Sequence, residues 1–224
     1  MDQGASEGSQ RGMDTTEDGA RAAALRHFPN AGAIERYVDI LLSRGIAWGL
    51  LGPRERERIW ARHVVNSVPH AGMLPDGCAV VDVGSGAGLP GIPLALLRED
   101  IEVVLLEPLL RRAEFLELTV GELNLGGRVS VIRGRVEELT GRFDVLTCRA
   151  VAPLNRLARW CAPALSDGAV LLALKGATVD DEIVAAAKDL RRLGLEAEAL
   201  RVAYTTDLPE AHVARVWSKA ARKD

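Results

Sequence analysis

Short apolar runs alternate with helical patterns through most of the chain after residue 76. Five of these runs predict strands, and they span residues 79–83, 102–107, 129–132, 143–147 and 169–174. Three segments between them carry apolar residues at helical spacing, and these span residues 92–97, 111–123 and 154–165. Strands that are apolar along their whole length are typical of a parallel sheet with helices on both faces.

Two further segments near the end of the chain alternate strictly between apolar and polar positions. They span residues 196–204 and 212–218 and follow each other closely. This alternation predicts an antiparallel pair of strands that closes one edge of the sheet. The sequence therefore predicts an α/β fold built on a doubly wound sheet of about seven strands.

The chain before the sheet has a different character. Residues 1–20 contain almost no apolar side chains, and we expect a disordered tail because such a segment buries too little surface to become ordered. From there to residue 75, apolar residues recur at helical spacing, over residues 20–42 and again over 53–68. We predict three regions, namely a tail at 1–20, a small helical subregion at 21–75 and the sheet domain at 76–224.

Composition adds expectations about the cellular compartment of the protein and about metal binding. The chain has 224 residues, of which 48% are hydrophobic, and this is enough for one sizeable core. Cys78, Cys148 and Cys161 are widely separated and lack zinc-type spacing, so we expect buried thiols and no metal. No apolar run approaches the ~18 residues of a membrane span, and the start of the chain lacks an apolar signal segment. We expect a soluble protein of the cytoplasm.

For nucleic-acid binding, the distribution of charge along the chain is more informative than the net charge. The formal net charge of −3 argues against nucleic-acid binding by bulk electrostatics alone. However, residues 76–107 hold one basic residue against six acidic ones, whereas residues 128–160 hold seven basic residues against three acidic ones. Only four of the 28 basic residues are lysines, and arginine favours bidentate contacts to phosphate. Any RNA partner should therefore be recognised selectively rather than by diffuse attraction.

The strongest local signal is a glycine-rich loop at residues 81–91, which reads Val-Asp-Val-Gly-Ser-Gly-Ala-Gly-Leu-Pro-Gly. It lies between the first strand of the sheet and the first helix. Glycines at Gly84, Gly86 and Gly88 allow the backbone to pass close to a ligand that a Cβ atom would obstruct. The loop therefore predicts a nucleotide-type ligand at this end of the sheet.

The spacing within the loop indicates which ligand fits. A dinucleotide fingerprint requires glycine at the sixth position, but the sixth residue counted from Gly84 is Leu89. Glu107 ends the second strand twenty-three residues after Gly84, where a carboxylate can accept both ribose hydroxyls. The pattern suits a nucleoside with an amino-acid tail, so it favours S-adenosylmethionine over NAD.

Five sequence blocks, in order, resemble the RsmG (GidB) family of 16S ribosomal RNA guanine-N7 methyltransferases. They are Arg-His-Val-Val-Asn-Ser at 62–67, the glycine loop extended to Pro93, Arg-Val-Glu-Glu-Leu at 135–139, Cys-Arg-Ala-Val-Ala-Pro-Leu at 148–154 and Leu-Lys-Gly at 174–176. The resemblance covers about residues 33–218, and the arginine-rich composition is typical of actinobacterial members, mycobacterial ones included. It implies a Rossmann-like class I S-adenosylmethionine-dependent methyltransferase that acts on guanosine 527 in the 530 loop, within 16S rRNA or the 30S subunit.

The resemblance also implies cofactor contacts at the carboxyl ends of the parallel strands, where open α/β sheets bind ligands. The residues that match the family are Gly84, Leu89, Val136, Glu137 and Arg149, to which the loop spacing and the second strand add Gly86, Gly88 and Glu107. Two positions depart from the family pattern. Asn66 stands where Asp is common, and Glu107 is one methylene longer than the usual Asp.

Methyl transfer to guanine N7 needs no general base, because N7 carries a lone pair and no proton at neutral pH. We therefore assign no catalytic residue and expect positioning to dominate. The RNA-binding candidates are Arg62, His63, Arg111, Arg112 and Lys175, with Arg133, Arg135 and Arg149 as further basic positions. We expect a monomer. A methyltransferase of another RNA or of a small molecule, and a non-catalytic ribosome-assembly module, stay open as alternatives, whereas Leu89 disfavours an NAD(P) oxidoreductase.

Overall fold

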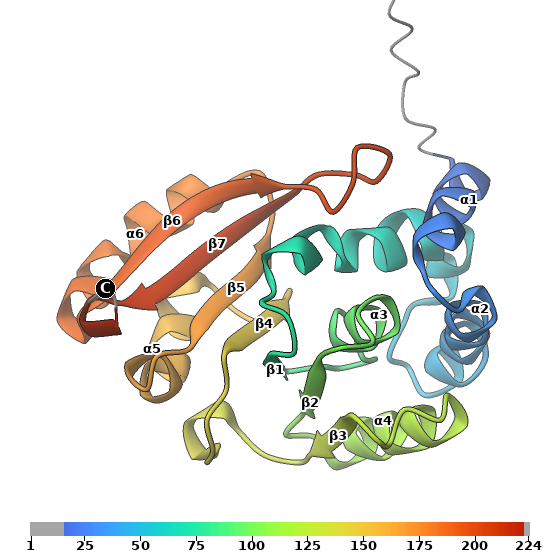
Figure 1. The fold of residues 1–224 in the computed structure, drawn as a ribbon, viewed down its shortest axis with the longest axis horizontal. Helices are drawn as coiled ribbons and strands as arrows, with labels where there is room; N and C mark the ends of the chain where they lie inside the picture. The colour runs from blue at the N-terminus through green and yellow to red at the C-terminus, as the bar shows by residue number, and fades with distance from the viewer. Residues whose placement is uncertain (1–15, 222–224) are drawn as a thin grey trace, which may run out of the picture.

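The computed structural model describes residues 16–221, and two helices open this part of the chain (Figure 1). Helix α1 (Glu17–His27) is capped by the Thr16 hydroxyl, which accepts the N–H of Gly19, and α2 (Ala31–Ile40) is capped in the same way by the side chain of Asn30. The first helix therefore begins within the segment predicted as a disordered tail, which is wrong for residues 17–20. Residues 1–15 of that tail lie outside the described residues.

Seven strands form one sheet in the order β3-β2-β1-β4-β5-β7-β6 (Figure 1). Their bounds are β1 Ala79–Val83, β2 Glu102–Leu106, β3 Val129–Ile132, β4 Val145–Arg149, β5 Val170–Lys175, β6 Leu195–Val202 and β7 Ala211–Ser218. Strands β1 to β5 pair in parallel, and β7 runs antiparallel between β5 and β6. The predicted α/β class and the antiparallel pair at the sheet edge are confirmed.

Helices cover both faces of the sheet (Figure 1). The N-terminal helices pack with α3 (Gly91–Leu97) and α4 (Leu110–Glu122) against one face, where side chains such as Val80 are buried. Helices α5 (Leu154–Ser166) and α6 (Val179–Leu193) pack against the other face, where the next residue of the same strand, Val81, is buried. Successive strand residues thus enter opposite cores, as their continuous apolar pattern predicts.

Helix α6 was not predicted from the sequence. Only Val179, Ala186 and Leu190 of its fifteen residues are buried, so its apolar stripe is thin and rich in alanine. The signals that define it are at its ends. Three acidic residues occupy the first turn, and Gly194 terminates it in the left-handed conformation with φ of +67°.

The helix predicted over residues 53–68 is broken into separate turns. These are η2 (Pro53–Arg58), η3 (Ile59–Val64) and η4 (Val65–Ser67), followed by η5 (Pro69–Met73). The carboxylate of Glu17 on α1 accepts the backbone N–H groups of Trp60 and Ala61, at 2.7 and 3.0 Å. A side chain distant in sequence therefore caps a new helical start at η3, and apolar periodicity cannot reveal this.

Other features bear on the expectations drawn from composition. Cys78, Cys148 and Cys161 are buried free thiols, as expected. No helix within residues 16–221 has the length and apolar character needed to cross a bilayer. Within the same range, no three His, Cys, Asp or Glu side chains are grouped so that they could hold a metal ion.

Candidate cofactor and RNA site

The glycine loop turns sharply above the end of β1. Gly84 has φ of +71°, in the left-handed region, and its N–H donates to the carbonyl oxygen of Leu106 on β2 at 2.8 Å. A Cβ atom at Gly84 would lie 3.1 Å from a methyl group of Val151, and one at Gly88 would lie 2.4 Å from Ile92. Both positions therefore require glycine, for backbone conformation and for space.

Asp82 anchors the loop from beneath. Its side chain is fully buried, and Oδ2 accepts the N–H of Gly91 at 3.0 Å, at the start of α3. Oδ1 has no hydrogen-bond partner within the described chain. Burial raises the pKa of Asp82 to about 7. The acid upstream of the glycines is thus a structural support of the loop rather than an exposed ligand.

Glu107 directly follows β2 and faces the loop. Its carboxylate is buried, with Oε2 accepting the N–H of Gly86 at 2.9 Å and Oε1 accepting that of Leu109 at 3.0 Å. Each carboxylate oxygen can accept a second hydrogen bond, so these contacts orient the group and leave acceptor capacity for a ligand.

Two adjoining cavities lie at the loop. The inner cavity has a volume of about 150 Å³ and is lined by Val136, Glu137 and Trp160 together with Gly84 and Val151. The loop cavity has a volume of about 530 Å³, shares Gly84 and Val151 with the first, and is also lined by Gly86, Leu89, Glu107 and Arg149. Seven of the eight predicted cofactor residues line one of these cavities. Gly88 does not, because it packs against Ile92 and Tyr37 inside the loop.

A third hollow, the outer cleft, lies on the other side of the turn that follows β4. Its volume is about 840 Å³, and Arg62, Asn66, Lys175, Glu182 and His212 line it. Arg149, Ala150 and Val151 line both the outer cleft and the loop cavity. Ala150 has φ of +55°, which is unusual for a residue other than glycine. A strained turn therefore separates the two spaces.

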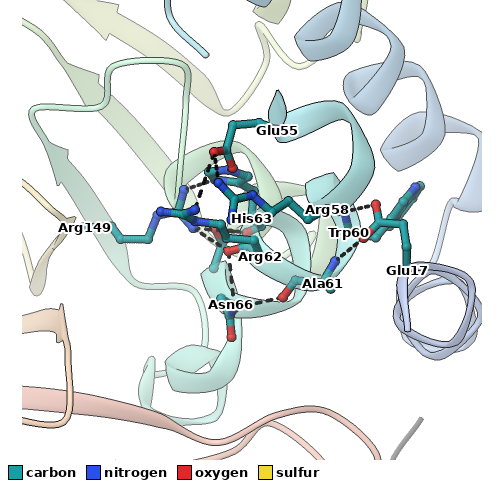
Figure 2. A network of polar contacts seen from close by, with 10 residues as sticks. Glu17, Glu55, Arg58, Trp60, Ala61, Arg62, His63, Asn66 and Arg149 are labelled. Carbon is teal, nitrogen blue, oxygen red and sulfur yellow. Dashed lines mark hydrogen bonds and ion pairs between the residues drawn. The ribbon is translucent and has the colours of Figure 1, made fainter. Parts of the chain in front are cut away.

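Arg149 belongs to a polar network with His63, Glu55 and Arg58 (Figure 2), and His63 also lines the loop cavity. Its Nη2 atom lies 2.7 Å from His63 Nδ1, and its Nη1 group donates to the carbonyl oxygens of Arg62 and His63. The other ring nitrogen of His63, Nε2, lies 2.7 Å from the carboxylate of Glu55. The Arg58 guanidinium lowers the pKa of Glu55 to about 2, and burial lowers that of His63.

Four of the five RNA-binding candidates line the outer cleft or the loop cavity, two at each, and Arg111 lines neither. Arg62 lines the outer cleft with 53% of its side chain exposed. Lys175 also lines it, but its ammonium group donates to Glu182 and to the carbonyl oxygen of Ala152, and its side chain is only 9% exposed. Arg112 lines the loop cavity, and Arg111 lies over the ring of Trp48 at 5.6 Å. His63 is buried in the Arg149 network.

Three contributors to these sites carried no sequence signal. Glu55 lies eight residues before His63 on a separate turn, Glu182 lies in the helix that was not predicted, and Trp160 looks like one more core position of α5. A spacing of eight residues between Glu55 and His63 predicts no contact on a continuous helix. The two side chains meet because the chain bends between η2 and η3. The family blocks at 62–67 and 148–154 did mark Arg149 and its direct partner His63.

The sheet order, with antiparallel β7 between β5 and β6, is that of the class I S-adenosylmethionine-dependent methyltransferase fold. Solved structures show the same fold. The O-methyltransferase NcsB1 from neocarzinostatin biosynthesis, in complex with S-adenosylmethionine, aligns with a TM-score of 0.57 and 17% identity, over 91% of this chain and 70% of that one. TYW2 from P. horikoshii aligns with a TM-score of 0.50 and 15% identity, over 67% and 60%.

Sequence comparison narrows the class to one family. The family profile for rRNA small subunit methyltransferase G matches residues 30–209. Proteins named ribosomal RNA small subunit methyltransferase G are 49% identical in Streptomyces avermitilis, over 81% of this chain and 77% of theirs, and 45% identical in Mycolicibacterium smegmatis, over 90% and 87%. The chain belongs to the rRNA small subunit methyltransferase G (GidB) family, and its cofactor is S-adenosylmethionine.

Proposed function

We propose that this protein transfers the methyl group of S-adenosylmethionine to N7 of guanosine 527, in the 530 loop of 16S ribosomal RNA. The observation that carries the proposal is the family match over residues 30–209, joined to a cofactor cavity that shares a wall with an outer cleft. The substrate is the RNA of the small subunit, free or within the 30S particle. We place the reaction in the cytoplasm and expect a monomer that needs no metal.

The two cavities at the glycine loop suit the two halves of the cofactor. Val136 and Trp160 give the inner cavity apolar walls that suit an adenine ring, and the carboxylate of Glu137 beside them would accept a hydrogen bond from the exocyclic amine of that ring. Glu107 keeps acceptor capacity for ribose hydroxyls. The loop cavity then receives the amino-acid tail.

The outer cleft is the proposed seat of the guanine. Asn66 donates its amide hydrogens to the carbonyl oxygens of Ala61 and Arg62, so its Oδ1 atom is left as an acceptor (Figure 2). Glu182 Oε2 accepts from Lys175 at 2.7 Å and from the N–H of Leu154, which leaves Oε1 as a second acceptor. Guanine presents donors at N1 and N2, on the side of the base opposite N7. Acceptors in the cleft can hold that edge while N7 stays free.

The chemistry requires little of the protein beyond placement. When bound, S-adenosylmethionine supplies a methyl group on a positively charged sulfur. Guanine N7 already has a free lone pair, so no side chain has to remove a proton. The residues of this chain would hold the two ligands in hollows that share Arg149, Ala150 and Val151, and positioning of this kind supplies a large part of a rate enhancement. We assign no side chain as a catalytic acid or base.

The test uses labelled S-adenosylmethionine with 30S subunits from cells that lack the gene. We expect one methyl group per subunit, mapped to N7 of guanosine 527, and no incorporation into subunits from wild-type cells, which serve as the matched control. Incorporation at another nucleotide would contradict the assignment of the site. Cofactor binding without any transfer would instead indicate a ribosome-binding module.

A further inference from the structure

Among residues 16–221, the Arg149 guanidinium makes its hydrogen bonds to neutral groups, and the carboxylates of Asp82 and Glu55 act on it without direct contact. Its guanidinium contacts one imidazole nitrogen and two backbone carbonyl oxygens, all of them on η3 or its side chains. Burial lowers the pKa of Arg149, but a guanidinium stays charged in proteins. A mostly buried charge with neutral partners, lining two cavities, is suited to receive an anion from a ligand.

The contact between Arg149 and His63 fixes the state of the imidazole. Because a guanidinium can only donate, His63 Nδ1 must accept, and its proton must lie on Nε2. Nε2 faces the carboxylate of Glu55 at 2.7 Å, which accepts that proton and stabilises this tautomer. Glu55 in turn is held by Arg58 at 2.6 Å. Glu55, His63 and Arg149 thus form an ordered relay (Figure 2). Arg149 at its end lines the loop cavity.

The ligand anion that fits Arg149 follows from the reaction. A cation beside guanine would oppose the positive charge that develops on the base as N7 is methylated, so guanine O6 is a poor partner during transfer. The methionine tail of the cofactor carries a carboxylate that is present before and after transfer. Arg149 shares the loop cavity with the glycine loop and with Glu107, the proposed ribose ligand.

We propose that Glu55 and His63 are positioning residues that hold the Arg149 guanidinium in the loop cavity, where it binds the methionine carboxylate of the cofactor. The relay removes the rotational freedom of a long side chain before the ligand arrives, and this reduces the entropic cost of binding. This inference rests on the proposed function only through its cofactor.

The test compares two ligands that share the nucleoside and the sulfur atom. S-adenosylhomocysteine carries the amino-acid carboxylate, and 5′-methylthioadenosine lacks it. In titration calorimetry on the full chain, we expect His63→Ala to weaken binding of S-adenosylhomocysteine about tenfold and that of 5′-methylthioadenosine less than twofold. His63→Asn should restore most of the affinity, because its Oδ1 atom can take the place of Nδ1 before Arg149.

The matched control is His70→Ala. His70 is also buried, but its Nε2 atom contacts Thr147 at 2.9 Å on the same strand as Arg149. This variant should unfold more readily and bind both ligands with unchanged affinity. Equal losses for both ligands in His63→Ala would show a merely structural role and overturn the proposal. An unchanged affinity for S-adenosylhomocysteine, with a raised KM for 30S subunits, would assign Arg149 to the RNA and overturn it too.

Acid provides an independent readout of the same relay. The charged or titratable groups that face His63 are Glu55 from η2, Arg149 from β4 and Arg62 from its own turn. A second proton on His63 would occupy Nδ1 and repel Arg149, so affinity for S-adenosylhomocysteine should fall as the pH drops below 6.5. His63→Asn should lose this dependence. Failure of the wild-type protein to bind S-adenosylhomocysteine at all would instead refute the proposed function.

Discussion

The hydroxyl group of Tyr37 donates a hydrogen bond of 2.8 Å to the carbonyl oxygen of Ala87, and this contact joins α2 to the glycine loop. Tyr37 is fully buried, and burial raises the pKa of its hydroxyl well above the usual value. The hydroxyl oxygen of Tyr37 also lies 3.1 Å from the position that a Cβ atom at Gly88 would occupy. The N-terminal helices therefore form part of the frame that shapes the cofactor loop.

Replacing Tyr37 by Phe should weaken both the fold and the cofactor site. The change leaves the Ala87 carbonyl oxygen buried without a donor, which costs about 1–3 kcal/mol of unfolding free energy, and the loop loses one anchor. We expect a lower urea midpoint and a several-fold weaker binding of S-adenosylhomocysteine. Tyr204→Phe is the control, since Tyr204 lies outside the cofactor cavities and should leave both quantities unchanged.

Gly84→Asp should abolish cofactor binding and leave the sheet folded. The new side chain would adopt φ of +71° and place its Cβ 3.1 Å from Val151, at the wall shared by both cofactor cavities. Gly77→Asp is a matched control, because Gly77 has φ of +66° but nothing within 4 Å of its Cβ position. Calorimetry with S-adenosylhomocysteine and far-ultraviolet circular dichroism distinguish the two. Retained affinity in Gly84→Asp would contradict the assigned place of the cofactor.

His70 should make the protein sensitive to acid. Burial lowers its pKa from 6.5 to about 4, so the unfolded chain binds a proton at a pH where the folded chain does not. Stability is therefore lost as the pH falls through this window, by about 1.4 kcal/mol per pH unit at most. His70→Asn should remove this contribution and leave the opposing one of Asp82, so that the unfolding free energy of the variant rises as the pH falls from 6.5 to 4. A slope equal to that of the wild type would argue against this origin.

Asp82 should change the stability of the protein with pH in the direction opposite to His70. Its pKa is raised by burial to about 7, so the folded state holds a proton that the unfolded state has released above pH 4. Stability should therefore fall as the pH rises from about 4 to 7. This slope opposes that of His70 over their shared window, and the wild-type protein should show little net dependence there. Asp82→Asn should expose the acid sensitivity of His70 in a urea titration repeated at each pH.

Arg62 is the exposed cation of the outer cleft best placed to contact RNA phosphate. Among residues 16–221 its side chain pairs with Glu55 alone, at 3.4 Å, so Arg62→Gln should leave the fold and the affinity for S-adenosylhomocysteine unchanged. We expect a several-fold rise in KM for 30S subunits, together with a weaker dependence of RNA binding on salt. Arg192→Gln is the control, because that residue is 71% exposed on α6 and does not line the cleft. A rise in KM of equal size in both variants would indicate only bulk charge.

The parts of the fold that follow local periodicity could be predicted from the sequence, and the parts set by distant contacts could not. The buried strands and the glycine loop are visible in the sequence. A strand covered on both faces requires apolar residues along its whole length, and only glycine fits at Gly84. Helix α6 escaped prediction since its buried stripe is thin. The break at residue 59 escaped since the carboxylate that caps η3 comes from Glu17, more than forty residues earlier.

The same limit applies to the site. The loop spacing, the end of the second strand and the family blocks together identified seven residues that line the cavities at the glycine loop, because these positions follow the strand ends directly. The role of Glu55 depends on the chain bending back so that its carboxylate meets His63. The ion pair of Lys175 with Glu182 likewise depends on α6 packing beside β5. Pairings of this kind are properties of the assembled fold.

The turn formed by Ala150 and Val151 has a consequence for the affinities of the two ligands. One face of this turn bounds the loop cavity and the other bounds the outer cleft. A ligand on either side that shifts the turn alters the affinity of the other side by the same factor, since coupling between two sites is reciprocal. We therefore expect the affinities for cofactor and RNA to be coupled through Ala150 and Val151, and a substitution at either residue to change that coupling.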